Sequence, residues 1–304
     1  MSHRILSCGE VLWDLFPESP RFGGAPANFA CHAALLGGSV TMLSAVGDDE
    51  RGREAVEILR GFGIGTSLIQ KSADAPTGTV GVNVDAAGRP SFEIHADSAW
   101  DRIAWTPELA ASIASTDAIY FGTLGQRGEI SRTTIQRALA SARERGIVRV
   151  LDVNLRAPFF DAALIHESVE LASVLKLSDE ELPAVANACG IACCRHAEDA
   201  LRAMLTLHDL DLVAMTRGAD GALLITADET ISQPGIPTVV RDTVGAGDSF
   251  TAALVIGLLR GNALAGIARN ACEISAAVCA HDGAVPERRV AGGADASLRA
   301  VPRN

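Results

Sequence analysis

The chain has 304 residues, of which 48% are hydrophobic and 21% charged, a balance typical of a globular protein with one large α/β domain or two smaller ones. Its formal net charge of −11 argues against nucleic acid or an anionic membrane as a partner, because both need a basic face. Apolar stretches such as 252–259 are much shorter than the roughly 20 residues that cross a bilayer, and acids interrupt the N-terminal segment before a signal peptide forms. We therefore expect a cytoplasmic protein.

The seven cysteines are expected to be reduced. Their odd number and their positions within apolar patterns predict buried thiols rather than disulfides. The segment CCRH at 193–196 resembles a metal motif, but adjacent cysteines fit zinc geometry poorly and no second spaced Cys or His pair accompanies them. No metal site is predicted there.

Strand-like runs alternate with helical patterns along most of the chain. A strand-like run at 4–10 precedes a helix at 26–38, and a second run at 40–47 precedes a helix at 50–63. Such alternation predicts an α/β fold with parallel strands joined by crossover helices. The same alternation resumes at 117–122, 130–146, 148–154, 168–178 and 211–218.

Polar or glycine-containing segments follow three of the predicted strands, at 152–156, 176–181 and 216–221. In open α/β sheets, ligands bind outside the carboxyl ends of the strands. We therefore expect these three segments to converge on one crevice.

Residues 77–99 interrupt the alternation with two strand-like halves around the turn signal DAAG, without a helix between them. This pattern predicts a β-hairpin, which residues 11–16 could join as a further strand. A sheet this small would cover the crevice as a lid, pair with another subunit, or do both. A decorative hairpin without such a role is the alternative.

A glycine-rich turn, GAGD at 245–248, precedes an apolar helical run that continues to 259. The first turn of a helix has unpaired N–H donors and a positive dipole end, so this turn is a candidate site for a phosphoryl group. Asp248 would stand beside that group and could accept a proton from an attacking hydroxyl. Alternatively, Asp248 only caps the helix and the glycines only supply the turn.

No other phosphate-binding motif is found. The chain has two lysines, Lys71 and Lys176, and neither follows a glycine, so a P-loop is excluded. The segment GFGIG at 61–65 follows a helix rather than a strand and is interpreted as a helix end and a turn. Backbone donors and arginine are therefore expected to neutralise the phosphoryl charge without a lysine.

Two segments carry a family resemblance. The sequence DTVGAGDSFTAALVIGLL at 242–259 resembles the C-terminal signature of the ribokinase-like carbohydrate kinases, the PfkB family. The segments GGAPANFACHAALLGG and VGDDERG, at 23–38 and 46–52, resemble its N-terminal signature. The resemblance implies one ribokinase-like three-layer α/β sandwich over 1–304, with a small β-sheet lid inserted at about 11–23 and 76–100. It further implies ATP-dependent phosphorylation of a sugar hydroxyl with Mg²⁺, and a homodimer formed through the lid.

The resemblance assigns the phosphoryl-transfer residues. Asp248 matches the catalytic base, and the backbone N–H groups of Gly245, Ala246 and Gly247 match the anion hole. Asp242 matches a position near a monovalent cation, usually K⁺, with a turn-stabilising role as the alternative.

The resemblance also assigns the sugar site. Asp14 would accept hydrogen bonds from sugar hydroxyls, Gly23 and Gly24 would let the backbone approach the ring, and Asn28 would bind vicinal hydroxyls. A turn at the glycines and a local cap at Asn28 are the alternatives. Arg156 would clamp the transferring phosphoryl group or a substrate oxygen, or else form a surface ion pair.

The nucleotide and Mg²⁺ contacts are implied at three places. In the segment 176–181, Ser178 stands where the family usually has asparagine, and Glu181 matches the acid that organises Mg²⁺ through water. The remaining ATP contacts would come from this strand end, the next loop and the C-terminal helix, which could equally be plain core. They are Lys176, Ser178, Thr216, Gly218, Gly221, Gly245, Gly247, Asn270 and Gly283.

The substrate is inferred from short segments of the sequence. The segments GEVLWDLFPES and DVNLRAPFF look most like bacterial fructokinases, which favours fructose. Ketodeoxygluconate kinases often contact their acid with tyrosines, and this chain has only Tyr120, within a predicted strand. Ribose or a nucleoside is a further alternative, because few lid contacts decide the substrate. A sensor without turnover on the same fold would typically lose the base, but Asp248 and its glycines are intact.

Overall fold

The larger of two sheets forms the middle layer of the structure. This computed structural model describes residues 2–84, 90–191 and 196–286, so the predicted turn at 85–88 and most of the CCRH segment lie outside the described residues. Within these ranges the sheet has nine strands. Their order is β13 (Thr230–Gln233), β12 (Ala222–Ile225), β11 (Leu212–Thr216), β10 (Val174–Ser178), β9 (Val148–Asp152), β8 (Ala118–Gly122), β1 (Arg4–Cys8), β4 (Ser39–Gly47) and β5 (Ile69–Ser72).

The strands from β11 to β5 run parallel, whereas β12 and β13 extend the sheet antiparallel at one edge. The parallel part confirms the expectation from the alternating pattern. The antiparallel edge was not predicted.

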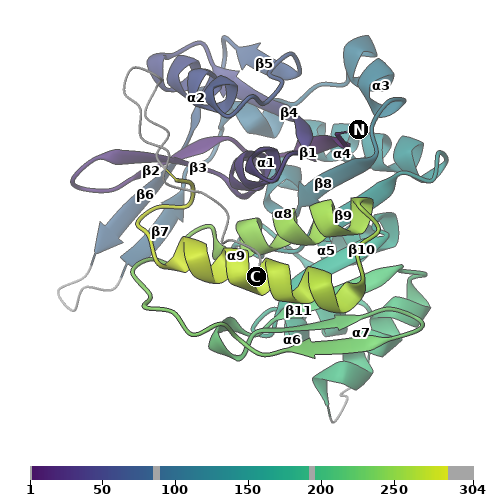
Figure 1. Ribbon diagram of the computed structural model, residues 1–304. Helices are drawn as coiled ribbons and strands as arrows, with labels where there is room; N and C mark the ends of the chain where they lie inside the picture. The colour runs from purple at the N-terminus through teal and green to yellow at the C-terminus, as the bar shows by residue number, and fades with distance from the viewer. Residues whose placement is uncertain (1, 85–89, 192–195, 287–304) are drawn as a thin grey trace.

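Helices cover both faces of this sheet (Figure 1). Alternate side chains of β1 enter opposite cores, with Ile5 in one and Leu6 and Cys8 in the other, as the two-residue period of a strand requires. The Ile5 face carries α1 (Ala25–Leu35), α2 (Glu50–Gly61), α8 (Ala246–Leu259) and α9 (Leu264–Cys279). The opposite face carries α3 (Pro107–Ile113), α4 (Glu129–Arg143), α5 (Ala162–Leu171), α6 (Leu182–Ala188) and α7 (Ala197–Leu207).

Three layers of this kind confirm the predicted α/β sandwich. Three short 3₁₀ turns complete the described elements, at η1 (Ala99–Arg102), η2 (Leu124–Gln126) and η3 (Gly218–Asp220). No helix within the described ranges has the length and apolar character needed to cross a membrane.

A second, four-stranded sheet stands at one side of the sandwich (Figure 1). Its order is β3 (Pro20–Gly23), β2 (Leu12–Leu15), β6 (Gly78–Val84) and β7 (Pro90–Ile94). The antiparallel pair of β6 and β7 confirms the predicted hairpin, and β2 pairs with β6 as its further strand. The two chain segments that build this sheet are therefore those expected for the lid.

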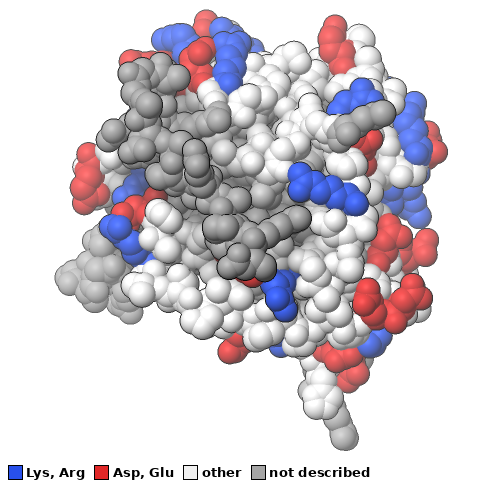
Figure 2. Space-filling model, viewed as in Figure 1, with Lys and Arg blue, Asp and Glu red and all other residues white. Residues whose placement is uncertain are grey.

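The surface seen in Figure 2 carries acidic and basic side chains interspersed around its margin, with uncharged residues between them. Interspersed charges are typical of a solvated surface, on which pairs of opposite sign contribute little to stability.

Candidate active site

A cavity of about 630 Å³ opens where the carboxyl ends of β1, β9 and β10 meet the small sheet. Glu10 follows β1, Asp152 ends β9 and Lys176 lies near the end of β10, while Asp14 and Val80 come from the small sheet. Two of the three strand ends predicted to converge thus line one cavity. The third, at 216–221, does not line it.

The cavity brings together about half of the predicted site residues. Those in its lining are Asp14, Gly24, Asn28, Arg156, Lys176, Asp242, Gly245, Gly247 and Asp248. Those outside its lining are Gly23, Ala246, Ser178, Glu181, Thr216, Gly218, Gly221, Asn270 and Gly283.

The glycine-rich turn begins α8 as expected, because Gly245 adopts a left-handed backbone with a φ of 78° before the first helical residue. A Cβ at Gly245 would lie 2.5 Å from the Ala284 carbonyl oxygen, so any other residue would collide there. The Ala246 N–H donates a hydrogen bond to the Thr243 carbonyl oxygen at 3.2 Å. This predicted donor of the anion hole therefore already has an acceptor within the chain. The N–H groups of Gly247 and Asp248 remain as the donors of this helix start.

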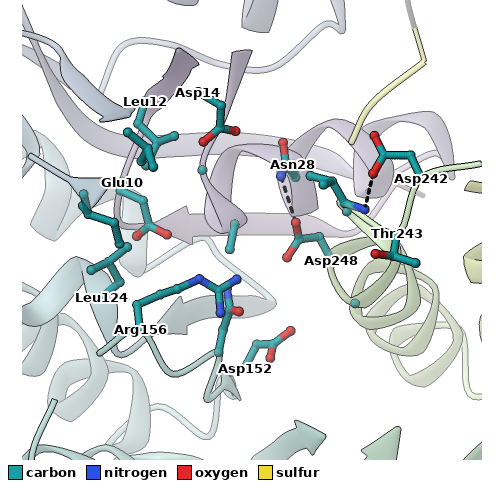
Figure 3. Close-up of a pocket in the computed structure, with 18 of the residues that line it drawn as sticks. Glu10, Leu12, Asp14, Asn28, Leu124, Asp152, Arg156, Asp242, Thr243 and Asp248 are labelled. Carbon is teal, nitrogen blue, oxygen red and sulfur yellow. Dashed lines mark hydrogen bonds between the residues drawn. The ribbon is translucent and has the colours of Figure 1, made fainter. Parts of the chain in front are cut away.

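Asp248 is buried in the first turn of α8 and accepts a hydrogen bond from Asn28 Nδ2 at 2.9 Å (Figure 3). The structure excludes a capping role for both residues, since Gly245 is the N-cap of α8 and Asn28 lies within α1. Burial raises the pKa of Asp248 above its ordinary value, although the Asn28 bond and the charges of Lys176 and Arg156 oppose the change. A carboxylate with a raised pKa is a better proton acceptor.

Lys176 forms a buried ion pair with Asp152, with Nζ 3.0 Å from Oδ1. The other Asp152 oxygen accepts a hydrogen bond from Thr251 on α8 at 2.8 Å. Burial disfavours the Lys176 ammonium, but the carboxylates of Asp152 and Glu181 outweigh it and raise the pKa of Lys176. Lys176 therefore stays charged.

The position of Lys176 corrects one expectation. Its Nζ lies 3.1 Å from the point where a Cβ on Gly247 would stand, so a fixed positive charge borders the candidate anion site. Backbone donors and arginine are thus not its only positive groups. The sequence places Lys176 among the expected ATP contacts, but it does not show that this lysine reaches the turn from a neighbouring strand.

Two acids and one arginine define the end of the cavity nearest the small sheet (Figure 3). Burial raises the pKa of Glu10 to about 7 and that of Asp14 to about 6, while the Arg156 charge lowers both. Glu10 Oε2 is buried with no hydrogen-bond partner among the described residues. It is a free acceptor that the sequence argument did not single out, although the quoted segment GEVLWD contains it.

Arg156 extends from the loop after β9 into this space (Figure 3). No carboxylate within the described ranges lies at ion-pair distance from it, so the alternative of a surface ion pair finds no partner. Two residues earlier, Asn154 lines the cavity with a φ of 41°. Such a backbone conformation is uncommon outside glycine and is often found at functional sites.

The Asp242 carboxylate accepts hydrogen bonds from two backbone N–H groups, as expected for the alternative, turn-stabilising role. One carboxylate oxygen accepts from Val244 N at 3.0 Å and the other from Gly283 N at 2.9 Å. The Arg21 guanidinium of the small sheet lies 3.6 Å from Asp242 as well. A monovalent cation at this carboxylate would therefore compete with three existing donors.

The candidate Mg²⁺ residue Glu181 caps backbone groups instead of facing the cavity. Its two oxygens accept hydrogen bonds from Leu155 N and Ser178 N, each at 2.7 Å. Both oxygens are occupied, so Glu181 fits Mg²⁺ only through intervening water.

The other predicted nucleotide contacts do not line the cavity. Ser178 and Thr216 are paired neighbours at the ends of β10 and β11, and η3 begins with Gly218. Asn270 is exposed on α9. Tyr120 is buried in β8 and stacks on Phe29 with ring centroids 3.9 Å apart, so it does not reach the cavity.

Comparison with known proteins identifies relatives over most of the chain. The family model described as pfkB family carbohydrate kinase matches residues 18–288. Aminoimidazole riboside kinase of Salmonella typhimurium is 30% identical over 272 residues, covering 86% of this chain and 82% of the relative. Fructokinase-2 of Solanum lycopersicum is 31% identical over 270 residues, covering 83% and 80%. A sugar kinase of Pyrococcus horikoshii, solved in complex with ATP, is 27% identical with a TM-score of 0.78 and covers 92% of this chain and 93% of that chain.

Proposed function

The chain belongs to the pfkB family of carbohydrate kinases, and from the geometry of its cavity we propose that it transfers the γ-phosphoryl group of ATP to a hydroxyl of fructose. The observation that carries the proposal is the position of Asp248. Its carboxylate is buried at the start of α8, bonded to Asn28 and one residue after Gly247, in the first turn whose N–H groups form the candidate anion site. A proton acceptor and an anion site therefore adjoin in one cavity.

In the proposed step, the Asp248 carboxylate takes the proton of the sugar hydroxyl as the sugar oxygen bonds to the γ-phosphorus. The bond from that phosphorus to the bridging oxygen breaks, and ADP leaves with its electron pair. Charge on the transferring group is stabilised by the N–H groups of Gly247 and Asp248 and by the side chains of Lys176 and Arg156.

ATP would extend from this point along the ends of β10 and β11, past Ser178, Thr216 and Gly218. The ATP complex of the Pyrococcus horikoshii relative supports a nucleotide site in this fold. Mg²⁺, when bound with ATP, would neutralise phosphate charge, and Glu181 would hold it through water. Asn270 and Gly283 are the proposed residues of the adenine wall.

Dependence of the activity on K⁺ stays a prediction, and the position of Arg21 argues against it. Arg21 lies 3.6 Å from the Asp242 carboxylate. Its guanidinium supplies a positive charge where the resemblance implies a cation. The rate measured with K⁺ or with tetramethylammonium as the counterion tests the requirement.

Fructose fits the charges and polarity at the end of the cavity nearest the small sheet. Asp14 and Glu10 supply acceptors for hydroxyl donors, and Asn28 supplies both a donor and an acceptor. An acidic sugar such as ketodeoxygluconate would meet two carboxyl groups there, whose negative charge already engages the nearby positive charges of Arg156 and Arg21. The pocket therefore disfavours the acid.

Aminoimidazole riboside is the second candidate substrate. One relative at 30% identity carries the name of that kinase. Four apolar side chains on the cavity wall could face a flat heterocycle, and the unpartnered Glu10 oxygen could accept from its amine. These apolar residues are Leu12, Val80, Ile94 and Leu124.

A homodimer through the small sheet is proposed because, within the described part of the chain, β3 and β7 are edge strands of this sheet at the side of the sandwich. Light scattering coupled to size exclusion measures the mass of the particle. A mass of one chain would refute the dimer.

A coupled ADP-release assay tests the substrate. We expect kcat/KM for fructose to exceed the values for aminoimidazole riboside, ribose, adenosine and ketodeoxygluconate by at least tenfold. A higher value for aminoimidazole riboside would establish the second candidate. ATP and sugar binding without turnover of any of the five would contradict a kinase.

A further inference from the structure

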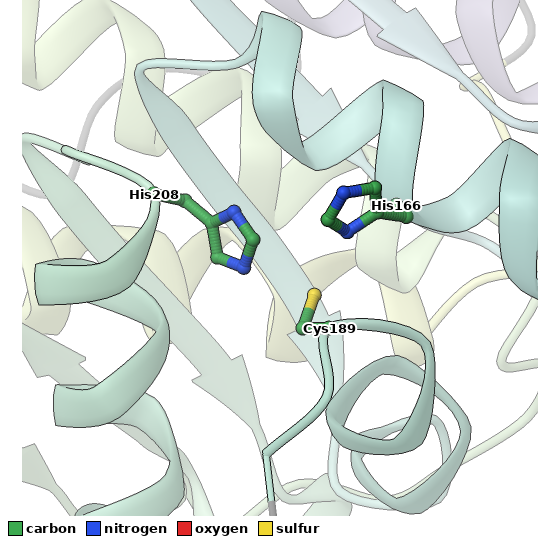
Figure 4. Close-up of side chains that lie close together, drawn as sticks. All are labelled: His166, Cys189 and His208. Carbon is green, nitrogen blue, oxygen red and sulfur yellow. The ribbon is translucent and has the colours of Figure 1, made fainter.

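Three side chains of the types that bind transition metals meet on the face of the sheet opposite α8 (Figure 4). His166 lies on α5, Cys189 ends α6 and His208 ends α7. Their ligand atoms all lie within 4.8 Å of one another. None of the three lines the active-site cavity, so the cluster is unrelated to phosphoryl transfer.

His208 is held in the orientation of a metal ligand. Its side chain is 1% exposed, and its Nδ1 bonds to the carboxylate of Glu170. Nε2 is buried and has no hydrogen-bond partner within the described ranges. A neutral ring that donates its Nδ1 proton to Glu170 leaves the Nε2 lone pair free, and metal-bound histidines typically make such a bond to a carboxylate.

Cys189 and His166 complete the set of donors. Figure 4 shows the Cys189 sulfur below the two imidazole rings, at the third corner of a triangle. Cys189 is buried, whereas His166 is exposed and gives an ion access from solvent. An unpartnered buried nitrogen facing a thiol and a second imidazole is costly without a ligand, because buried polar atoms are nearly always hydrogen-bonded or coordinated.

The distances between the three ligand atoms suit a small tetrahedral ion once the side chains move slightly closer together. Bonds of about 2.0–2.1 Å to nitrogen and about 2.3 Å to sulfur place tetrahedral ligand atoms about 3.3–3.6 Å apart. The ligand atoms lie up to 4.8 Å apart, so the three side chains must close by about 1.2–1.5 Å to hold the ion, and His166 is exposed and has the freedom to rotate toward it.

We propose that His166, Cys189 and His208 bind one Zn²⁺ ion, with water as the fourth ligand and Glu170 orienting the His208 ring. Two imidazole nitrogens and one thiolate favour zinc over Mg²⁺ or Ca²⁺, which prefer oxygen. The ion replaces the thiol proton of Cys189, which is released to solvent. Because the ligands come from three helices, binding ties the ends of α6 and α7 to α5 and stabilises this side of the sandwich.

Metal binding by the full-length protein, freed of metal with a chelator, tests the site without reference to kinase activity. Calorimetric titration with Zn²⁺ should show one ion per chain, and a hundredfold excess over Kd should raise Tm by about 5 °C. Co²⁺ used as a spectroscopic probe should give a thiolate-to-cobalt charge-transfer band.

Two variants and one control separate this site from other thiols and histidines. His166→Gln and Cys189→Ser should each weaken Zn²⁺ binding at least tenfold, and Cys189→Ser should abolish the thiolate band. His281→Gln removes another exposed histidine, at the end of α9, and should leave binding unchanged. His166 is exposed, so its variant is expected to fold.

Failure to bind Zn²⁺ in the wild-type protein would overturn the proposal. So would equal affinity in the wild-type protein, His166→Gln and Cys189→Ser, because the ion would then be held elsewhere, for instance by the cysteines at 193 and 194.

Discussion

Asn28 and Asp248 are 220 positions apart in the chain and are joined by a buried hydrogen bond of 2.9 Å between Nδ2 and Oδ2. The bond connects α1 to the first turn of α8, two helices that pack side by side on one face of the sheet. It fixes the carboxylate that we propose as the base, with its second oxygen left for a substrate.

Removal of this bond should shift the pH dependence of catalysis. The Asn28 amide stabilises the charged form of Asp248 and lowers its pKa, so Asn28→Ala should raise that pKa further. Because the base must be ionised, the acidic limb of the pH profile of kcat should move to higher pH. An unchanged limb, measured from pH 5 to 9, would show that Asp248 is not the titrating base.

Glu10 should control sugar binding near neutral pH. Burial raises its pKa to about 7, so the carboxylate gains its charge, and its full strength as an acceptor, as the pH rises through that value. The KM for sugar should fall across this range in the wild-type protein and stay flat in Glu10→Gln. The acidic limb in the pH profile of kcat, which we attribute to Asp248, should persist in Glu10→Gln.

Asp14→Asn is the matched control for Glu10→Gln, because burial raises the pKa of Asp14 only to about 6. In Asp14→Asn, the KM for sugar should still fall as the pH rises through about 7. If Glu10→Gln retains that change, Glu10 does not face the sugar.

Lys176→Met should destabilise the protein by about 3–5 kcal/mol, because it leaves the buried Asp152 carboxylate without its counter-ion. Asp152 is an acid whose pKa is raised in the folded state to about 6, and loss of Lys176 should raise it further. Ionisation of such a group opposes folding. The loss in the free energy of unfolding caused by Lys176→Met, measured by urea denaturation, should therefore be smaller at pH 5 than at pH 8.

Addition of Asp152→Asn to Lys176→Met removes the unpaired charge and should recover at least half of the lost stability. Activity should not return, because the positive charge beside Gly247 is still missing. A stable and active Lys176→Met protein would remove Lys176 from the anion site.

Gly247→Val should lower kcat at least a hundredfold by placing a branched side chain where the phosphoryl group is proposed to lie. Its Cβ would approach Lys176 Nζ at 3.1 Å, and the buried ion pair with Asp152 holds that nitrogen in place, so Tm should fall as well and kcat is measured on the folded protein. Near-normal kinetics in a folded Gly247→Val protein would make this turn structural only.

The sequence predicted features whose signals are local. The alternation of strands and helices, the hairpin and the glycine turn before α8 are each readable from short windows, because backbone conformation there depends on neighbouring residues. All three are present in the structure.

Side-chain contacts between segments far apart in the chain could not be predicted from the sequence, because they depend on how the strands and helices pack. Lys176 meets Asp152 and Gly247 only because β9 and β10 are neighbours and α8 begins above them. The pairing of Arg21 with Asp242 depends in the same way on the placement of the small sheet. Glu10 lay within a quoted motif, but its burial, which makes it unusual, is a tertiary property.

The central claim is that Asp248 accepts the proton of the sugar hydroxyl at the start of α8. Single-turnover phosphoryl transfer in Asp248→Asn, at saturating ATP and sugar, tests it most directly. The amide keeps the shape and the backbone donors but cannot accept the proton, so the rate should fall by about 10²–10⁴ while the Kd for ATP changes less than threefold. A single-turnover rate within threefold of the wild-type rate would contradict the claim.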